Sequence, residues 1–262
     1  MKLKIYQVDA FANHVFGGNP AAIIPLERWL PDDLLQKIAA ENNLSETAYI
    51  IKEIDKYLIR WFTPAVEVDL CGHATLAAAH VIFSHEGFED DVLSFYSPRS
   101  GILEVERSND GLLTLDFPKD TIRQIEISKE IAAGFSIAPI EMWKGGSDYI
   151  LVYEKEEQIL EIEVDLFELA KVDTRGFIIT APGVKVDFVS RWYGPRVGVD
   201  EDPVTGSAHT SLTPLWAGKL KKNQLNAVQL SKRLGKLICE LAGERVRIGG
   251  KAVTYLIGEI FV

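Results

Sequence analysis

Short segments of alternating or mostly apolar residues, bounded by turn-forming residues, run along most of this chain. Residues 2–11 alternate between polar and apolar and lead into the turn Gly17-Gly18-Asn19-Pro20. Runs of this length with such boundaries are typical of β-strands. The same pattern predicts strands at 21–26, 44–51, 57–63, 92–97, 101–107, 111–117, 148–154, 176–181, 186–193, 226–230, 236–242, 245–248 and 252–262.

Three segments instead follow a helical pattern. Pro31, with Asp32 and Asp33 in the first turn, begins a helix with one apolar face that ends at Asn42-Asn43. The runs from Gly72 to Phe83 and from Gly206 onward have no clearly polar face, which predicts helices that are buried on all sides.

Strands are predicted before and after both apolar helices. We therefore expect an α+β protein in which each half is a sheet wrapped around a central helix, with the boundary near 117–120. Pro214 lies inside the second apolar run and should kink or end that helix, because proline lacks an N–H and clashes one turn back.

The starts of the two apolar helices resemble each other. Asp69-Leu70-Cys71-Gly72-His73-Ala74-Thr75 and Asp202-Pro203-Val204-Thr205-Gly206-Ser207-Ala208-His209 both read as a small or polar residue, Gly, a polar residue and Ala. Glycine allows close approach of a ligand, and the unpaired N–H groups of a helix start attract carboxylate or phosphate. We expect two half-sites that face one anionic ligand.

Composition narrows the class of protein. The 262 residues are 47% hydrophobic and 25% charged, which is typical of a soluble globular protein. The formal net charge of −10 argues against nucleic acid as a partner. No signal-peptide core and no membrane-length apolar run occur, so we expect a cytoplasmic protein without membrane contact. Two cysteines give no disulfide framework, and the histidine spacing gives no metal site.

Several blocks in order along the chain are similar to the phenazine-biosynthesis PhzF-like isomerase family, within the diaminopimelate-epimerase-like fold superfamily. They cover nearly the whole chain, and together they are specific. The blocks are Asp9-Ala10-Phe11, Gly18-Asn19-Pro20-Ala21, Asn43-Leu44-Ser45-Glu46-Thr47, Arg60-Trp61-Phe62-Thr63-Pro64, Cys71-Gly72-His73-Ala74-Thr75 and Glu201-Asp202-Pro203-Val204-Thr205-Gly206-Ser207-Ala208-His209.

The resemblance implies two pseudo-symmetric domains, each a barrel-like sheet around a central helix, with the active site in the cleft between them. We assign 1–117 with 252–262 to the first domain and 118–251 to the second. It also implies a cofactor-independent isomerase that shifts a proton within a small carboxylic acid, and a homodimer.

Site residues follow from the matched motifs. The resemblance implies that Glu46 is the general acid and base, and that His73 binds and orients the substrate, with Asp202 as a further catalytic group. The implied substrate-binding residues lie around the two glycines: Cys71, Gly72, Ala74, Thr205, Gly206 and Ser207.

Simpler interpretations stand beside these roles. Glu46 serves as a proton shuttle only if burial or a nearby acid such as Asp202 lets it hold a proton near neutral pH; otherwise it is a surface residue at a strand start. Asp202 is also a candidate helix cap, and Ser207 a first-turn hydroxyl that satisfies a helix amide. His14, His80, His85 and His209 are assigned structural roles, with His80 and His85 on different faces of their helix.

Cys71 leaves an alternative function open. In related epimerases and racemases paired cysteines precede the two glycines, whereas here Thr205, a poor proton carrier, takes the second position. A Cys71-dependent racemase or dehydratase of amino or imino acids therefore competes with the isomerase, as does a non-catalytic protein that binds a small carboxylate. A Cys71–His73 hydrolase is disfavoured because residues two apart on a helix diverge.

Overall fold

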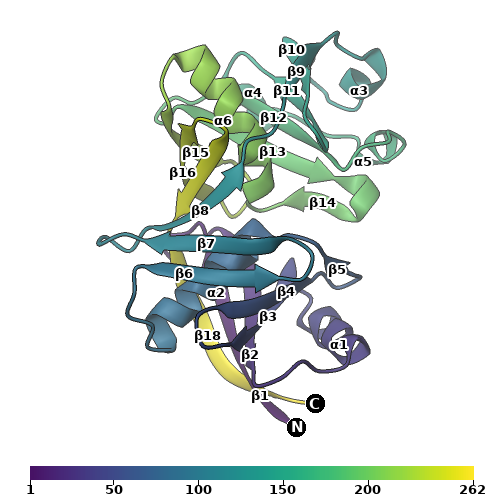
Figure 1. The fold of residues 1–262 in the computed structure, drawn as a ribbon. Coiled ribbons are helices and arrows are strands. Elements are labelled where there is room, and N and C mark those ends of the chain that lie inside the picture. Colours follow the sequence, from purple (N-terminus) through teal and green to yellow (C-terminus); the bar gives the residue numbers. More distant parts are fainter. The chain divides into compact units, whose positions relative to one another are not determined.

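Two compact units make up the chain. A computed structural model describes residues 1–262, which divide into Met1–Asp116 with Gly249–Val262 (unit 1) and Phe117–Ile248 (unit 2) (Figure 1). None of the helices is both long enough and apolar enough to cross a lipid bilayer.

Unit 1 is a sheet that surrounds helix α2. Its strands follow the order β18-β1-β2-β3-β4-β6-β7-β8, with β5 on β4; the β2–β3 and β4–β6 pairs are parallel, and the other registered pairs are antiparallel. The elements are β1 (Lys2–Ala10), β2 (Asn19–Leu26), α1 (Asp32–Asn42), β3 (Glu46–Lys52), β4 (Tyr57–Phe62), β5 (Glu67–Val68), α2 (Gly72–His85), β6 (Val92–Ser97), β7 (Gly101–Arg107), β8 (Leu113–Pro118) and β18 (Ala252–Phe261).

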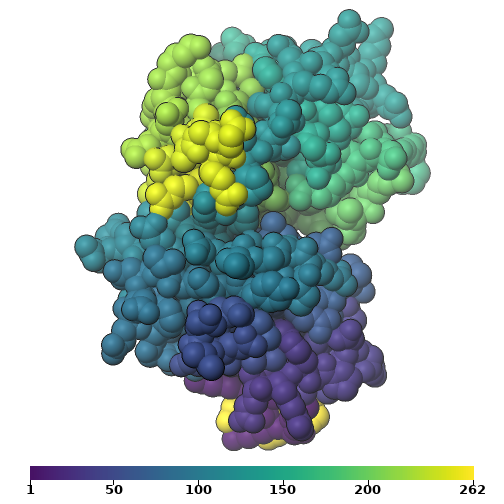
Figure 2. All heavy atoms as spheres, viewed as in Figure 1, coloured from purple at the N-terminus to yellow at the C-terminus, as the bar shows by residue number.

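Helix α2 is buried because almost every side chain on it is apolar or small. Ten of its residues are buried, from His73 to Phe83, and they pack on β1, β2, β3 and β18. The last strand closes the sheet beside the first: Lys2 of β1 pairs with Phe261 of β18, so both chain ends lie together (Figure 2).

Unit 2 has the same plan around helix α6. Its strands follow the order β9-β10-β11-β12-β13-β15-β16, with β14 on β13; β11–β12 and β13–β15 are parallel, and the other registered pairs are antiparallel. The elements are β9 (Arg123–Ile125), α3 (Lys129–Ala133), β10 (Glu141–Lys144), β11 (Asp148–Val152), α4 (Glu156–Glu161), α5 (Leu166–Leu169), β12 (Gly176–Pro182), β13 (Phe188–Gly194), η1 (Pro195–Val197), β14 (Val199–Asp202), α6 (Gly206–Leu220), β15 (Gln224–Gln229), β16 (Gly235–Ala242) and β17 (Arg245–Gly250).

The pairings make the units internal repeats of one topology. The series β1, β2, β3, β4, β6, β7 in unit 1 corresponds to β10, β11, β12, β13, β15, β16 in unit 2, with the same two parallel pairs. Each central helix follows a short strand, β5 or β14, and precedes the parallel partner of β4 or β13. The predicted α+β architecture of a sheet around a central helix in each half is confirmed.

Pro214 does not end α6, which was one of the two outcomes predicted from the sequence. The helix continues from Gly206 to Leu220. Proline at this position leaves the carbonyl of Thr210, four residues earlier, without its helical donor. The backbone N–H of Asp120 donates to that carbonyl at 3.2 Å, so a strand-to-strand connection supplies the missing hydrogen bond.

Candidate functional site

The start of α2 is set by Cys71, which is the N-cap residue and has an extended backbone (φ −141°, ψ 108°). Its carbonyl accepts hydrogen bonds from the backbone N–H of Thr75 at 3.1 Å and from the Thr75 hydroxyl at 2.6 Å. No side chain caps the helix. The amides of the first turn therefore have no intrahelical acceptor and point out of the helix start.

Glu46 and His73 meet at this helix start. Glu46 is the first residue of β3 and His73 the second of α2, and Glu46 Oε2 lies 3.0 Å from His73 Nε2. The side chains are 17% and 6% exposed, respectively. Neither of these two atoms has an aligned hydrogen-bond partner, so the contact is a close pairing of charge rather than a well-aligned hydrogen bond.

The other ring nitrogen of His73 faces Asn19 and Cys71. Asn19 Nδ2 lies 3.3 Å from Nδ1 and Cys71 Sγ 3.5 Å from it. Asn19 is fully buried and follows Gly18, whose φ is +61°. A side chain at Gly18 would place its Cβ only 2.0 Å from the carbonyl oxygen of Ala10, so glycine is required there.

The expectation that Cys71 and His73 diverge is wrong. That expectation placed both residues within the helix, where positions two apart point in different directions. Cys71 instead precedes the helix with an extended backbone, so its thiol turns back toward the His73 ring.

The charges at this start are coupled. Burial opposes the charged form of His73, but a thiolate at Cys71 and the carboxylate of Glu46 favour it, and the net effect raises the pKa of His73 well above 6.5. Burial and then Glu46 raise the pKa of the Cys71 thiol above 9.0. The thiol is therefore neutral at pH 7.

Glu46, Cys71 and His73 also form the cluster whose ligand atoms lie near enough to suggest a metal ion, within 4.8 Å of one another. Their arrangement around the ring argues against shared coordination. Glu46 faces Nε2 and Cys71 faces Nδ1, and these lone pairs point to opposite edges of the imidazole. A single ion bound to His73 would meet only one of its two neighbours without rotation of the ring.

The start of α6 in unit 2 is held by Gln229. The N-cap is Thr205, whose backbone N–H donates to Gln229 Oε1 at 2.8 Å, while Gln229 Nε2 donates to the carbonyl of Asp202 at 2.8 Å. Asp202 accepts the hydroxyl hydrogen of Thr205. The alternative interpretation of Asp202 as the N-cap is therefore wrong, because Thr205 occupies that position.

Ser207, the second residue of α6, is exposed, and its hydroxyl meets an arginine. Arg175 Nη1 donates to Ser207 Oγ at 3.0 Å. Arg175 is also paired with Asp148, which is 3% exposed and accepts from Trp192 Nε1 at 3.1 Å. Sequence reasoning did not identify Arg175, since it belongs to none of the motif blocks.

The structure thus gathers the predicted site residues into one group in each unit. In unit 1 Glu46 lies beside the α2 start that holds Cys71, Gly72, His73 and Ala74. In unit 2 Asp202, Thr205, Gly206 and Ser207 surround the α6 start.

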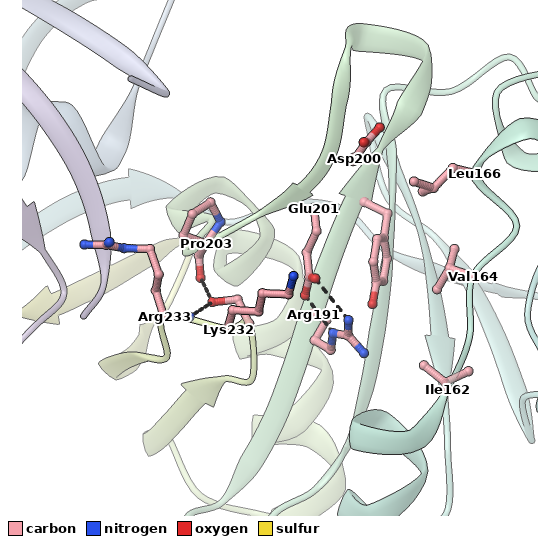
Figure 3. A pocket seen from close by; sticks show the side chains of 11 residues that line it. Ile162, Val164, Leu166, Arg191, Asp200, Glu201, Pro203, Lys232 and Arg233 are labelled. Atoms are coloured by element: carbon pink, nitrogen blue, oxygen red, sulfur yellow. Dashed lines mark hydrogen bonds and ion pairs between the residues drawn. The ribbon is translucent and has the colours of Figure 1, made fainter. Parts of the chain in front are cut away.

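A hollow of about 530 Å³ lies beside the second group (Figure 3). Ile162, Val164 and Leu166 form one apolar wall, and the Arg191–Glu201 ion pair lies across its centre. The predicted site residues do not line it. The polar contacts at the helix starts, rather than this hollow, mark the candidate site.

The remaining histidines lie in structural settings. His80 Nε2 and His85 Nε2 both lie within hydrogen-bond distance of the Thr254 hydroxyl, at 2.9 and 2.8 Å. The prediction that their spacing separates them is wrong, because His85 is the last residue of α2 and its ring turns back to that hydroxyl. His209 is fully buried with Nδ1 2.9 Å from the carbonyl of Thr205.

The chain is similar in sequence and in structure to members of one protein family. The family model described as phenazine biosynthesis-like protein (PhzC–PhzF) matches residues 8–258. An uncharacterized isomerase of Pseudomonas aeruginosa is 47% identical over 260 residues, which cover 99% of each chain. The crystal structure of a PhzF-family phenazine biosynthesis protein from Enterococcus faecalis is 44% identical and superposes with a TM-score of 0.97, and the match covers 100% of both chains.

More distant structures share the fold alone. A hydroxyproline epimerase from Agrobacterium vitis, solved with bound trans-4-hydroxy-L-proline, is 11% identical and superposes with a TM-score of 0.62 over 99% of this chain and 92% of its own. The motif blocks, the repeated sheet-and-helix topology and the match over 8–258 agree, and this chain belongs to the PhzC–PhzF phenazine biosynthesis-like family.

Proposed function

We propose that this protein is an isomerase that moves a proton between two carbon atoms of a small carboxylate-bearing substrate, with Glu46 as the acid and the base. The observation that carries the proposal is the 3.0 Å pairing of Glu46 with a mostly buried His73 at a helix start whose amides face outward. Membership of a family whose relatives include proteins named isomerases supports the same class of reaction.

Each proton in the proposed reaction is accounted for. Glu46 accepts a proton from a substrate carbon, and the electron pair of the broken C–H bond delocalises into the substrate's π system and carboxylate. Cys71 and Glu46 raise the pKa of His73 well above its usual value, so the ring keeps its proton and donates a hydrogen bond to the negative charge that develops. Glu46 then returns the proton to a different carbon. Electrons balance within the substrate, so the step requires no cofactor.

The group in unit 2 has a binding role in this proposal. Asp202, Thr205 and Ser207 present polar atoms next to the first amides of α6, which favour negative charge. Carboxylate capture alone has no need of a second acid, so Asp202 is proposed to contact the reacting part of the substrate. We extend the proposal to a homodimer in the cytoplasm, and sedimentation velocity at several protein concentrations tests the dimer.

The test is solvent-proton exchange. A panel of small carboxylic and amino acids is incubated with the protein in heavy water, and deuterium incorporation is followed by NMR and mass spectrometry. Glu46→Gln is expected to lower the incorporation rate by roughly 10²- to 10⁴-fold. Glu27→Gln, an exposed glutamate in the same unit, is the matched control and should leave the rate unchanged. Exchange at the wild-type rate in Glu46→Gln would refute the assignment.

One contact favours the alternative enzyme. Cys71 Sγ lies 3.5 Å from His73 Nδ1, which is a geometry from which the imidazole can take a thiol proton once the ring is neutral. Two observations oppose a two-cysteine racemase: burial raises the pKa of Cys71, and Thr205 stands at the equivalent N-cap of α6. Thiol alkylation that abolishes exchange while Glu46→Gln retains it would favour the Cys71 mechanism.

A further inference from the structure

Three hydrogen bonds fix the Arg175 side chain and leave two of its N–H groups for a ligand. Its side chain is 37% exposed, and three hydrogen bonds, from Nε and Nη2 to Asp148 and from Nη1 to Ser207, use three of its N–H groups. A guanidinium carries five N–H groups, so two remain, one on each terminal nitrogen. Two such N–H groups are the donors that bind a carboxylate in a bidentate pair.

Arg175 keeps its positive charge because of its ion pair with Asp148. Burial opposes it, but the hydrogen bond and charge of Asp148 outweigh burial and raise the pKa of Arg175 above its usual value. Asp148 is fixed in turn by Trp192 Nε1. The guanidinium is therefore a preorganised cation beside the first turn of a fifteen-residue helix, whose N-terminal amides add positive potential.

A charged side chain also meets the start of the central helix in the other unit. In unit 1 Glu46 begins β3, the strand that runs parallel to β2, and reaches the second residue of α2, His73. In unit 2 Arg175 directly precedes β12, the strand that runs parallel to β11, and reaches the second residue of α6, Ser207. Both contacts measure 3.0 Å. Arg175 does not occupy the register position of Glu46, since Glu46 pairs with the third residue of β2 (Ala21), whereas Gly176 pairs with the first residue of β11 (Asp148). What the two units share is a charged side chain that reaches the second residue of the central helix.

We infer that Arg175 is the substrate-binding residue that selects a carboxylate, held for that purpose by Asp148 and Ser207 at the start of α6. This inference rests on the proposed function and deepens it, because it names the residue that recognises the acid group of the substrate. The ligand class is a planar carboxylate, which matches the two remaining N–H groups, rather than a neutral amide or ester.

The experiment uses benzoate as the probe and benzamide as its uncharged counterpart. Each is titrated into the full chain, and NMR follows the backbone amides of residues 206–208 and the Arg175 Nε signal. Benzoate should shift these signals and benzamide should not. Arg175→Met should weaken benzoate binding by roughly tenfold to a hundredfold, and Arg175→Lys, which keeps the charge and loses the fork, by less.

Two further variants protect the result against misfolding. Arg175→Met leaves Asp148 buried and unpaired, so Asp148→Asn combined with Arg175→Met removes both charges and should bind benzoate as weakly. Arg191→Met breaks the matched Arg191–Glu201 pair of the same unit and should leave benzoate binding unchanged. Benzoate that moves none of these signals, or that binds all variants equally, overturns the inference. Exchange that persists in Glu46→Gln refutes the proposed function instead and leaves the benzoate result standing.

Discussion

The two central helices begin in the same way and face opposite partners. At the start of α2 a carboxylate, Glu46, pairs with a ring nitrogen of His73. At the start of α6 a guanidinium, Arg175, donates to a hydroxyl, Ser207. Both helix starts thus place a charged side chain against the second residue of the helix, a carboxylate in unit 1 and a guanidinium in unit 2.

Histidines sharpen the contrast. His73 at the second position of α2 has its pKa raised well above 6.5, because the neighbouring Cys71 and Glu46 side chains outweigh burial. His209 at the fourth position of α6 is equally enclosed but meets only a backbone carbonyl, and burial lowers its pKa to about 4. Burial alone therefore does not decide the charge of a histidine; a neighbouring carboxylate reverses its effect.

The largest predicted effect is on proton transfer. His73→Asn removes the donor beside Glu46 and should lower solvent-deuterium incorporation by roughly 10²- to 10⁴-fold. His14→Asn, an exposed histidine of the same unit, is the control and should exchange at the wild-type rate. Deuterium incorporation at the wild-type rate in His73→Asn would refute a role for His73 in proton transfer.

The next effect concerns stability at mildly acid pH. His209 is neutral in the folded chain with a pKa of about 4, whereas the unfolded chain binds its proton near 6.5. The unfolded state therefore takes up more protons between these values, and stability is complete above 6.5 and falls as pH falls toward 4. From pH 7 to pH 5 this residue should cost about 2 kcal/mol of unfolding free energy.

Denaturant unfolding of His209→Gln at both pH values measures this contribution. The variant should lose about 2 kcal/mol less than the wild type between pH 7 and pH 5, while His14→Gln should follow the wild type. Equal losses in all three proteins would contradict the contrast between the two histidines.

A smaller effect tests how unit 2 tolerates Pro214. Asp120 supplies the N–H for the Thr210 carbonyl, and its carboxylate accepts from Gly146 N at 3.0 Å and from Ser211 Oγ at 2.6 Å. Asp120→Ala keeps the backbone bond but removes the carboxylate, so unfolding free energy should fall by roughly 1.5 kcal/mol. Asp120→Asn retains an acceptor and should lose less; the reverse order would show that the carboxylate does not anchor Asp120 beside α6.

The smallest effect is expected at Cys71. Its thiol is neutral near pH 7, because burial raises its pKa, and it contributes only a weak contact to His73 Nδ1. Cys71→Ala should keep the deuterium incorporation rate within about threefold of wild type. A decrease in the incorporation rate as large as that expected for Glu46→Gln would instead support the Cys71-dependent mechanism.

Sequence patterns were most informative where local chemistry determines the structure. The starts of both apolar helices at Gly72 and Gly206, and the position of Glu46 at the mouth of a strand, follow from glycine, apolar runs and strand alternation. The end of α1 at Asn43 likewise follows from its left-handed backbone (φ 48°).

Local sequence patterns did not predict the contacts between segments that are distant in the sequence. Arg175 lies 32 residues from Ser207 in sequence and has no motif around it, and Asn19 lies 54 residues from His73. The continuation of α6 through Pro214 depends on Asp120, which is remote in sequence.

The hydroxyl of Thr254 couples the protonation of two histidine rings, His80 and His85. It lies 2.9 Å from His80 Nε2 and 2.8 Å from His85 Nε2, and it has a single hydrogen to give. Burial, with the charge of His85, lowers the pKa of His80 to about 4, so His80 is a neutral imidazole at pH 7. If His80 receives the hydroxyl hydrogen, His85 must donate its own, and the reverse assignment exchanges both. A change of tautomer in one ring thus requires the hydroxyl to rotate and the other ring to change its tautomer in the opposite sense. The hydrogen-bonding states of the end of α2 and of β18 are therefore coupled through Thr254.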